Sequence, residues 1–119
     1  MTITIYHNPR CSKSRKTLEL IEAAGISPEI VNYLDSPPPA SRILELAAKI
    51  GVAVAELLRR NEDVFKNADD LPALDNDAAI ASWISKNPRV LQRPIVIDDD
   101  SGVAIVARPP ENVHELLHS

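Results

Sequence analysis

Residues 1–34 alternate between β-prone and helical patterns, and this order constrains the fold more than any other feature of the chain. Residues 2–6 read T-I-T-I-Y, and this period-two pattern predicts a strand. Apolar residues at helical spacing follow over 12–24, and Gly25 is a natural end for that helix. A second β-prone run covers 29–34, far enough along the chain to pair parallel to the first. We therefore predict a βαβ unit.

The rest of the sequence predicts helices and then a hairpin. The helical stretches are 43–50, 54–60 and 77–86, with a polar and partly irregular segment over 61–72. Strands are predicted over 94–97 and 103–106, joined by turn formers, with a last helix over 110–118. This is the order of an α/β protein with a thioredoxin-like fold. Its mixed sheet has about four strands, and a helical insertion separates the βαβ and ββα halves.

Length and composition narrow the possible classes of protein. The chain has 119 residues, which predicts one domain over 1–119. Its net charge of -4 argues against a protein that coats nucleic acid, and no apolar run approaches the roughly 18 residues of a membrane span. No export signal is visible, so we expect a cytoplasmic protein. The one cysteine can form neither an internal disulfide nor a structural zinc site.

That cysteine, Cys11, lies in a basic segment where the first predicted strand gives way to a helix. Arg10, Lys13, Arg15 and Lys16 surround it, with no acidic residue among them. Nearby cations and the positive end of a helix dipole both favour the thiolate, which is the reactive form of cysteine. Free backbone N–H groups at the helix start can also bind an oxyanion. We therefore interpret Cys11 as an activated nucleophile rather than a buried apolar residue.

The residues after Cys11 restrict its chemistry. Ser14 stands where a Cys-x-x-Cys redox pair has its second cysteine, and Thr17 stands where a Cys-x5-Arg phosphatase loop has its arginine. Both of those site types are excluded. Any redox step therefore needs a thiol from another molecule.

Four sequence motifs together carry a resemblance to a known family. They are Y-H-N-P-R-C-S-K-S-R at 6–15, L-L-R-R-N at 57–61, R-P-I-V at 93–96 and R-P at 108–109. The chain resembles the glutaredoxin-coupled arsenate reductases of the ArsC family, most closely the shorter YfgD-type branch. The likeness runs from residue 2 to the last predicted helix.

The resemblance implies a role for individual residues. Cys11 matches the nucleophile, and His7 matches the residue associated with lowering its pKa. Three arginines match those that bind arsenate: Arg59, Arg93 and Arg108. Further positions at the binding site match Asn8, Ser14 and Arg15. Pro94 resembles the cis-proline of thioredoxin-like folds.

The function implied is reduction of arsenate, or a related oxyanion, to arsenite, as in arsenic resistance. The Cys11 thiolate would form an adduct with arsenate, and glutathione as cosubstrate and glutaredoxin would supply the electrons. We expect no bound cofactor and no metal, because His114 and His118 have a metal-compatible spacing but no third ligand. Two alternatives are a monothiol glutathione-dependent thiol oxidoreductase and a non-enzymatic Spx-like regulator that binds RNA polymerase.

Overall fold

The computed structural model describes residues 1–117, so the predicted helix end at His118 lies outside the described residues. The chain forms two compact units. Unit 1 combines Met1–Tyr33 with the chain from Arg93 onward, and unit 2 is Leu34–Gln92. Unit 2 thus lies in sequence where the helical insertion was predicted. The prediction of a single domain stays a prediction.

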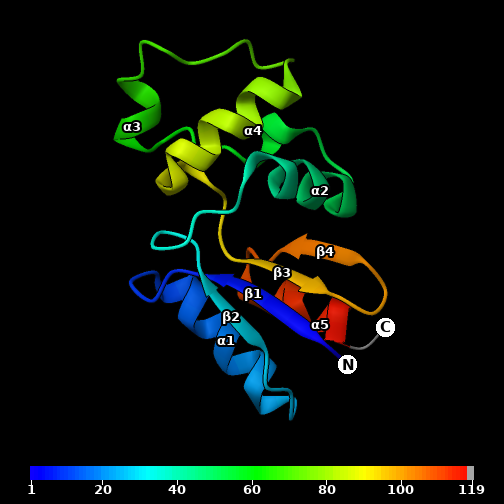
Figure 1. Cartoon of the computed structure of the whole chain (residues 1–119). Coiled ribbons are helices and arrows are strands. Elements are labelled where there is room, and N and C mark those ends of the chain that lie inside the picture. The colour runs from blue at the N-terminus through cyan, green and yellow to red at the C-terminus, as the bar shows by residue number, and fades with distance from the viewer. Residues whose placement is uncertain (118–119) are drawn as a thin grey trace. The chain divides into compact units, whose positions relative to one another are not determined.

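Unit 1 contains a four-stranded mixed sheet with the order β2-β1-β3-β4 (Figure 1). The strands are β1 (Ile3–His7), β2 (Glu29–Asn32), β3 (Ile95–Asp98) and β4 (Val103–Val106). β1 pairs parallel to β2 and antiparallel to β3, which forms the predicted hairpin with β4. The parallel pair confirms the βαβ unit, and the thioredoxin-like α/β fold is confirmed with it.

Two helices pack against this sheet and build its core. They are α1 (Ser12–Ala23) and α5 (Val113–Leu117), the latter following a 3-10 turn, η3 (Pro110–Asn112). Alternate residues of β1 face them, as a period-two strand requires. The core consists of apolar side chains from helices and strands: Ile3, Ile5, Ile21, Val96, Ala107, Val113 and Leu116. This core holds the carboxyl end of β1 and the start of α1 in a defined place.

Unit 2 is helical. Its elements are α2 (Ala40–Ile50), η1 (Val54–Leu57), α3 (Asp63–Lys66), α4 (Asp77–Lys86) and η2 (Pro88–Val90). α2 packs on α4, and their buried faces carry Ile43, Leu46, Ile80 and Ile84. The helix α3 interrupts the stretch that was expected to be partly irregular.

The predicted helix over 54–60 is wrong beyond its first turn. Only the 3-10 turn η1 forms, and Leu58 is extended and bridges to Leu91. The N–H of Arg59 donates to the Val90 carbonyl at 2.6 Å, and the N–H of Gln92 donates to the Leu57 carbonyl at 2.7 Å. These long-range bonds replace the i to i-4 bonds of a helix, so Arg59 is not on a helix as the apolar pattern suggested.

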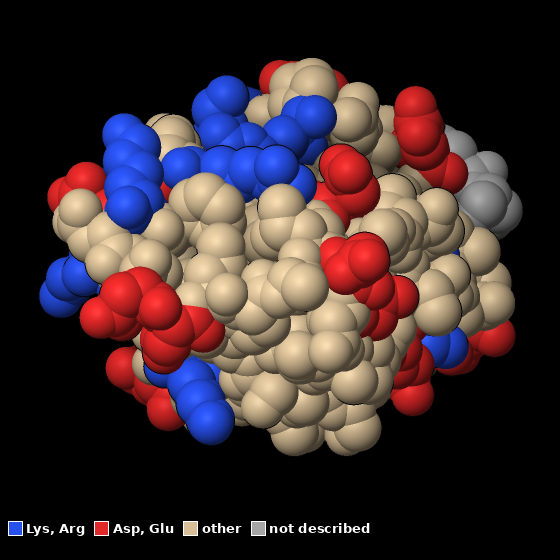
Figure 2. Space-filling view, turned by 90° about the horizontal axis from the view of Figure 1, so that it is seen from above, with Lys and Arg blue, Asp and Glu red and all other residues tan. Residues whose placement is uncertain are grey.

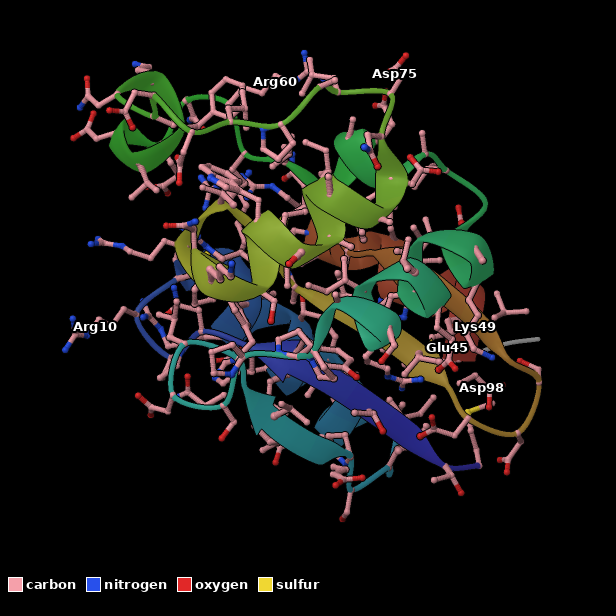
Figure 3. All side chains as sticks on the ribbon, turned by 45° about the horizontal axis from the view of Figure 1, so that its top comes forward. Arg10, Glu45, Lys49, Arg60, Asp75 and Asp98 are labelled. Atoms are coloured by element: carbon pink, nitrogen blue, oxygen red, sulfur yellow. The ribbon has the colours of Figure 1, made fainter. Side chains whose placement is uncertain are left out.

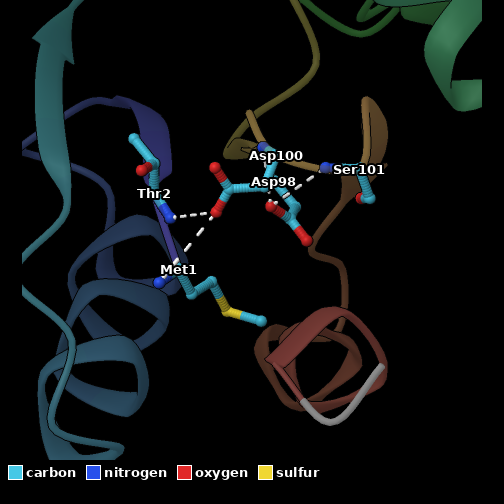
Figure 4. A network of polar contacts seen from close by, with 5 residues as sticks. All are labelled: Met1, Thr2, Asp98, Asp100 and Ser101. Carbon is cyan, nitrogen blue, oxygen red and sulfur yellow. Dashed lines mark hydrogen bonds and ion pairs between the residues drawn. The ribbon is translucent and has the colours of Figure 1, made fainter.

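The acidic turn after β3 is more structured than a solvated loop. Asp98 is buried, and its carboxylate accepts the N–H groups of Asp100 at 3.0 Å and Ser101 at 3.4 Å (Figure 4). Asp100 in turn accepts the N–H of Thr2 at 2.8 Å and lies 4.0 Å from the amino group of Met1. The turn therefore fastens the start of the chain to the hairpin.

Among the described residues, no helix is long and apolar enough to cross a membrane. Figure 2 shows one face of the molecule, on which acidic, basic and uncharged side chains are interspersed and several basic ones gather in one group. The net charge of -4 is therefore not spread as a uniform acidic surface on this face.

Candidate active site

Cys11 stands immediately before α1, where the chain leaves the sheet. Its backbone is extended (φ -94°, ψ 122°), and its N–H donates to the Asn8 carbonyl at 3.0 Å. Its own carbonyl accepts the N–H of Arg15 at 3.0 Å, which closes the first turn of the helix. The side chain is partly exposed. The thiol thus lies at the amino end of a 12-residue helix, as the sequence predicted.

The loop that carries Cys11 is held by two buried polar residues, Asn8 and Ser14. The N–H of Asn8 donates to Ser14 Oγ at 3.0 Å, and Asn8 Oδ1 accepts the N–H of Arg10 at 3.0 Å. Together with the Asn8 carbonyl, these bonds fix the turn between β1 and α1. Both residues were predicted to bind substrate. Their described hydrogen bonds position Cys11, and direct substrate contact stays a prediction.

His7 reaches this loop through Ser14. Its Nδ1 lies 2.7 Å from Ser14 Oγ. Burial lowers the pKa of His7, and the positive charge of Arg15 lowers it further. A neutral ring can accept the Ser14 hydroxyl proton at Nδ1 while Ser14 Oγ accepts the N–H of Asn8, so all three groups are satisfied. The structure therefore connects His7 to the loop, and its catalytic role stays a prediction.

The pKa of the Cys11 thiol is lowered by groups that surround the sulfur. Burial acts in the opposite direction and raises it, but hydrogen bonds from the Ser14 N–H, the Arg93 side chain and the Lys13 N–H outweigh that effect. The positive charge of Arg93 adds to them. Backbone N–H groups at a helix start and a cation are the two influences that activate cysteines. The predicted activation of Cys11 is therefore supported by the geometry.

The cations next to Cys11 in sequence are not the ones that act most strongly on it. Arg10, Lys13 and Lys16 are exposed, and Figure 3 shows the Arg10 side chain extending away from the loop. Arg15 donates from Nη1 to the Pro9 carbonyl at 2.8 Å and so supports the loop. The main side-chain contribution comes from Arg93, far along the chain. Sequence reasoning had assigned the effect to the local cations, because only they are visibly near Cys11.

The sheet brings Arg93 and Arg108 to the end that carries Cys11. Arg93 precedes β3 through a cis peptide bond to Pro94, which confirms what the resemblance implied. Arg108 follows β4 and also precedes a cis-proline, and its Nη1 donates to the Arg93 carbonyl at 3.5 Å. Ile95 pairs with both Tyr6 and Val106, so the end of β1, the start of β3 and the end of β4 coincide. Two predicted arginines thus share one edge of the sheet.

The third predicted arginine, Arg59, belongs to unit 2. Its side chain is only 14% exposed and lies 3.7 Å from the carboxylate of Glu62. Its neighbour Arg60 is exposed on the segment after η1 (Figure 3). The two adjacent arginines thus lie in different environments. The role of Arg59 in substrate binding stays a prediction.

Tyr33, which the sequence analysis did not single out, belongs to the site. It directly follows β2, and the parallel register that pairs His7 with Asn32 places it beside the Asn8 end of the loop. It is fully buried, and burial raises the pKa of its phenol against the opposing effect of Arg93 and Asn8. The predicted parallel pairing of 2–6 with 29–34 could have identified it, since residues just beyond paired strands meet at one edge.

The arrangement fits an anion better than a metal. Within residues 1–117, no group of three or more histidine, cysteine, aspartate or glutamate side chains could hold a metal ion, and His118 lies outside that range. Cys11 instead meets N–H donors and the Arg93 guanidinium, and Arg108 donates a hydrogen bond to the Arg93 carbonyl. Guanidinium groups can bind two oxygens at once, so this site can attract an oxyanion and attack it with a thiolate.

Comparison with known proteins points the same way. The model of the ArsC family matches residues 6–116. An arsenate reductase from Neisseria meningitidis serogroup A is 45% identical over 97% of both chains, and the uncharacterized protein YfgD of Escherichia coli K12 is 40% identical over 97% of this chain and 96% of its own. A solved structure, a putative arsenate reductase from Yersinia pestis, superimposes with a TM-score of 0.85 at 42% identity, covering 95% of this chain and 98% of that one.

Proposed function

Because this chain belongs to the ArsC family, we propose that it reduces arsenate to arsenite, with the Cys11 thiolate as nucleophile and with glutathione and glutaredoxin as the source of electrons. The observation that carries the proposal is the place of Cys11 at the start of α1, where its sulfur meets the N–H groups of Ser14 and Lys13 and the guanidinium of Arg93. These contacts lower the pKa of the thiol. A role in arsenic resistance follows from this activity.

Arsenate is an anion at neutral pH, so a thiolate can approach it only where positive charge offsets the repulsion. Arg93 already hydrogen-bonds the sulfur, and Arg108 is anchored to the Arg93 backbone. Their guanidinium groups can bind arsenate oxygens and stabilise the charge that moves onto them during attack. The donors are held by the protein before the substrate binds, so little reorganisation is needed in the transition state.

The reaction balances with external thiols. Cys11 Sγ attacks arsenic, an oxygen leaves as water after protonation, and a sulfur–arsenic(V) bond forms. The glutathione thiolate then attacks Cys11 Sγ, the electron pair of the sulfur–arsenic bond stays on arsenic, and arsenite leaves as arsenic(III). A mixed disulfide between Cys11 and glutathione remains. A glutaredoxin thiol removes the glutathione and restores Cys11, which is required because the chain has one cysteine.

The test is arsenate-dependent turnover with glutathione and glutaredoxin, comparing the wild-type protein with Cys11→Ser. We expect the variant to fold and to lose turnover, because a hydroxyl is a much weaker nucleophile at neutral pH. When glutaredoxin is omitted from the reaction, we expect mass spectrometry of the wild-type protein to find glutathione on Cys11. Turnover by Cys11→Ser would contradict the proposal. So would a wild-type protein that cleaves glutathione mixed disulfides but leaves arsenate unreduced, which is the thiol oxidoreductase alternative.

A further inference from the structure

The Tyr33 side chain is fully enclosed, yet no residue in the described part of the chain accepts the proton of its hydroxyl. Buried polar groups are bonded in the great majority of cases, and leaving one unbonded is costly. Tyr33 is one of two tyrosines in the chain, and it lies beside the nucleophile's loop rather than in the apolar core between sheet and helices. The missing acceptor at this place therefore points to a ligand that binds there reversibly.

The residues around the hydroxyl lack a free acceptor for its proton. Arg93 interacts with Tyr33, but a guanidinium has N–H donors and no acceptor. Asn8 lowers the pKa of the Tyr33 phenol, which is the effect of an amide N–H donor, while its Oδ1 accepts the N–H of Arg10 at 3.0 Å. Cys11 acts on Tyr33 through its charge, without a hydrogen bond between them. Arg93 and Asn8 can thus donate toward Tyr33 Oη, while the phenolic proton has no acceptor among these residues.

The phenol also keeps its proton under ordinary conditions. Burial raises the pKa of Tyr33 above its normal value near 10, and this effect exceeds the opposing one of Arg93 and Asn8. At neutral pH Tyr33 is therefore a neutral hydrogen-bond donor. It can serve an anion without adding a further charge to a site that already holds Arg93 and Arg108.

We propose that Tyr33 Oη donates a hydrogen bond to an oxygen of the tetrahedral oxyanion bound at Cys11 and Arg93, which makes Tyr33 a further catalytic residue. Oxyanion oxygens are the acceptor that the site lacks, and they gain negative charge as the sulfur attacks, so the bond strengthens in the transition state. The inference rests on the proposed function for the identity of the oxyanion, but its binding step can be tested without turnover.

The experiment measures how well arsenate, or inorganic phosphate, protects Cys11 from alkylation by iodoacetamide in the absence of any reductant. The variant is Tyr33→Phe, which keeps the ring and removes only the hydroxyl. The control is Tyr6→Phe, because Tyr6 is the other tyrosine and is not among the groups that shift the pKa of Cys11. We expect Tyr33→Phe to raise the half-protecting anion concentration about tenfold, as for loss of one hydrogen bond to a charged group, and Tyr6→Phe to leave it unchanged.

Two further readouts separate this contact from a purely structural role. Without anion, the pH profile of Cys11 alkylation is expected to stay the same in Tyr33→Phe; a shifted profile would mean that Tyr33 acts through Arg93 and would overturn the proposal. The melting temperature is expected to change little, because no group of the described protein accepts the proton of the hydroxyl that is removed. A clear fall in melting temperature would show that the hydroxyl is bonded within the protein and would overturn the proposal. Unchanged protection of Cys11 by the anion in Tyr33→Phe would also overturn it.

Arsenate turnover, measured in parallel, distinguishes failure of this inference from failure of the proposed function. If wild-type protein binds oxyanions without reducing arsenate, and Tyr33→Phe weakens that binding, the Tyr33 contact stands and the proposed function fails. If wild-type protein reduces arsenate and Tyr33→Phe reduces it equally well, the proposed function stands and the Tyr33 contact fails.

Discussion

Replacing Arg93 with lysine tests the largest side-chain contribution to the reactivity of Cys11. Arg93 lowers the pKa of the thiol both by a hydrogen bond and by its charge. Hydrogen bonds to charged groups contribute about 1.5 to 3 kcal/mol. Lysine keeps the charge but lacks the planar guanidinium that donates the hydrogen bond. We therefore expect the thiolate to lose stabilisation near the lower limit of that energy range, which lowers the thiolate-to-thiol ratio about tenfold. We expect the rate of arsenate reduction to fall by more than this factor, because the Arg93 guanidinium is also expected to bind arsenate oxygens.

The assay is the rate of Cys11 alkylation by iodoacetamide as a function of pH. In Arg93→Lys the midpoint of the profile is expected to move up, and the rate below that midpoint to fall about tenfold. The matched control is Arg60→Lys, since Arg60 is an exposed arginine of unit 2. Its profile is expected to equal that of the wild-type protein.

Two results would refute this reasoning. An unchanged profile for Arg93→Lys would mean that the hydrogen bond from the guanidinium does not lower the pKa of Cys11, because lysine keeps the charge at this position. An equal shift in Arg93→Lys and Arg60→Lys would mean that the shift does not come from contact of residue 93 with the sulfur, because of these two arginines only Arg93 interacts with Cys11 and neither substitution changes the charge.

Two further predictions concern the loop. Ser14→Ala leaves the Asn8 N–H and His7 Nδ1 without their partner, so we expect the free energy of unfolding in urea to fall by about 1 to 3 kcal/mol, whereas Ser12→Ala at an exposed position barely changes it. Burial, and then the charge of Arg15, lower the pKa of His7, so between the two pKa values the folded protein binds fewer protons at His7 than the unfolded chain does. We therefore expect the free energy of unfolding to decrease as the pH falls from about 6.5, the pKa in the unfolded chain, toward the lower pKa in the folded protein. His7→Asn removes this component, and parallel stability curves for the two proteins would contradict it.

Several features of the structure were already determined by local sequence patterns. Alternation over 2–6, helical spacing over 12–24 and the turn formers between 97 and 103 each depend on neighbouring residues, so they predicted β1, α1 and the β3-β4 hairpin within a residue or two. The place of Cys11 at the start of α1 follows from the same local patterns. A strand-to-helix junction needs no information from the rest of the chain.

Other features depended on residues far apart in the sequence. The segment after η1 gave a helical pattern, but hydrogen bonds from Arg59 to Val90 and from Gln92 to Leu57 decided its conformation. Asp98 lies in an acidic run that looks solvated, yet folding buries it as an acceptor for its own turn. In the first case a tertiary partner supplied the hydrogen bonds that the local pattern had assigned to a helix. In the second case the hydrogen bonds are local, and only the burial of Asp98 depends on the tertiary structure.

The site shows the same division. Cys11 and the backbone N–H donors beside it are local to the start of α1, and the sequence alone placed them there. The guanidinium that acts most strongly on Cys11 and the buried hydroxyl of Tyr33 arrive only because β1 pairs with β2 on one side and with β3 on the other. Burial, and with it the pKa of each group, depends on everything packed around that group, so only the tertiary structure could decide which charges matter at the sulfur.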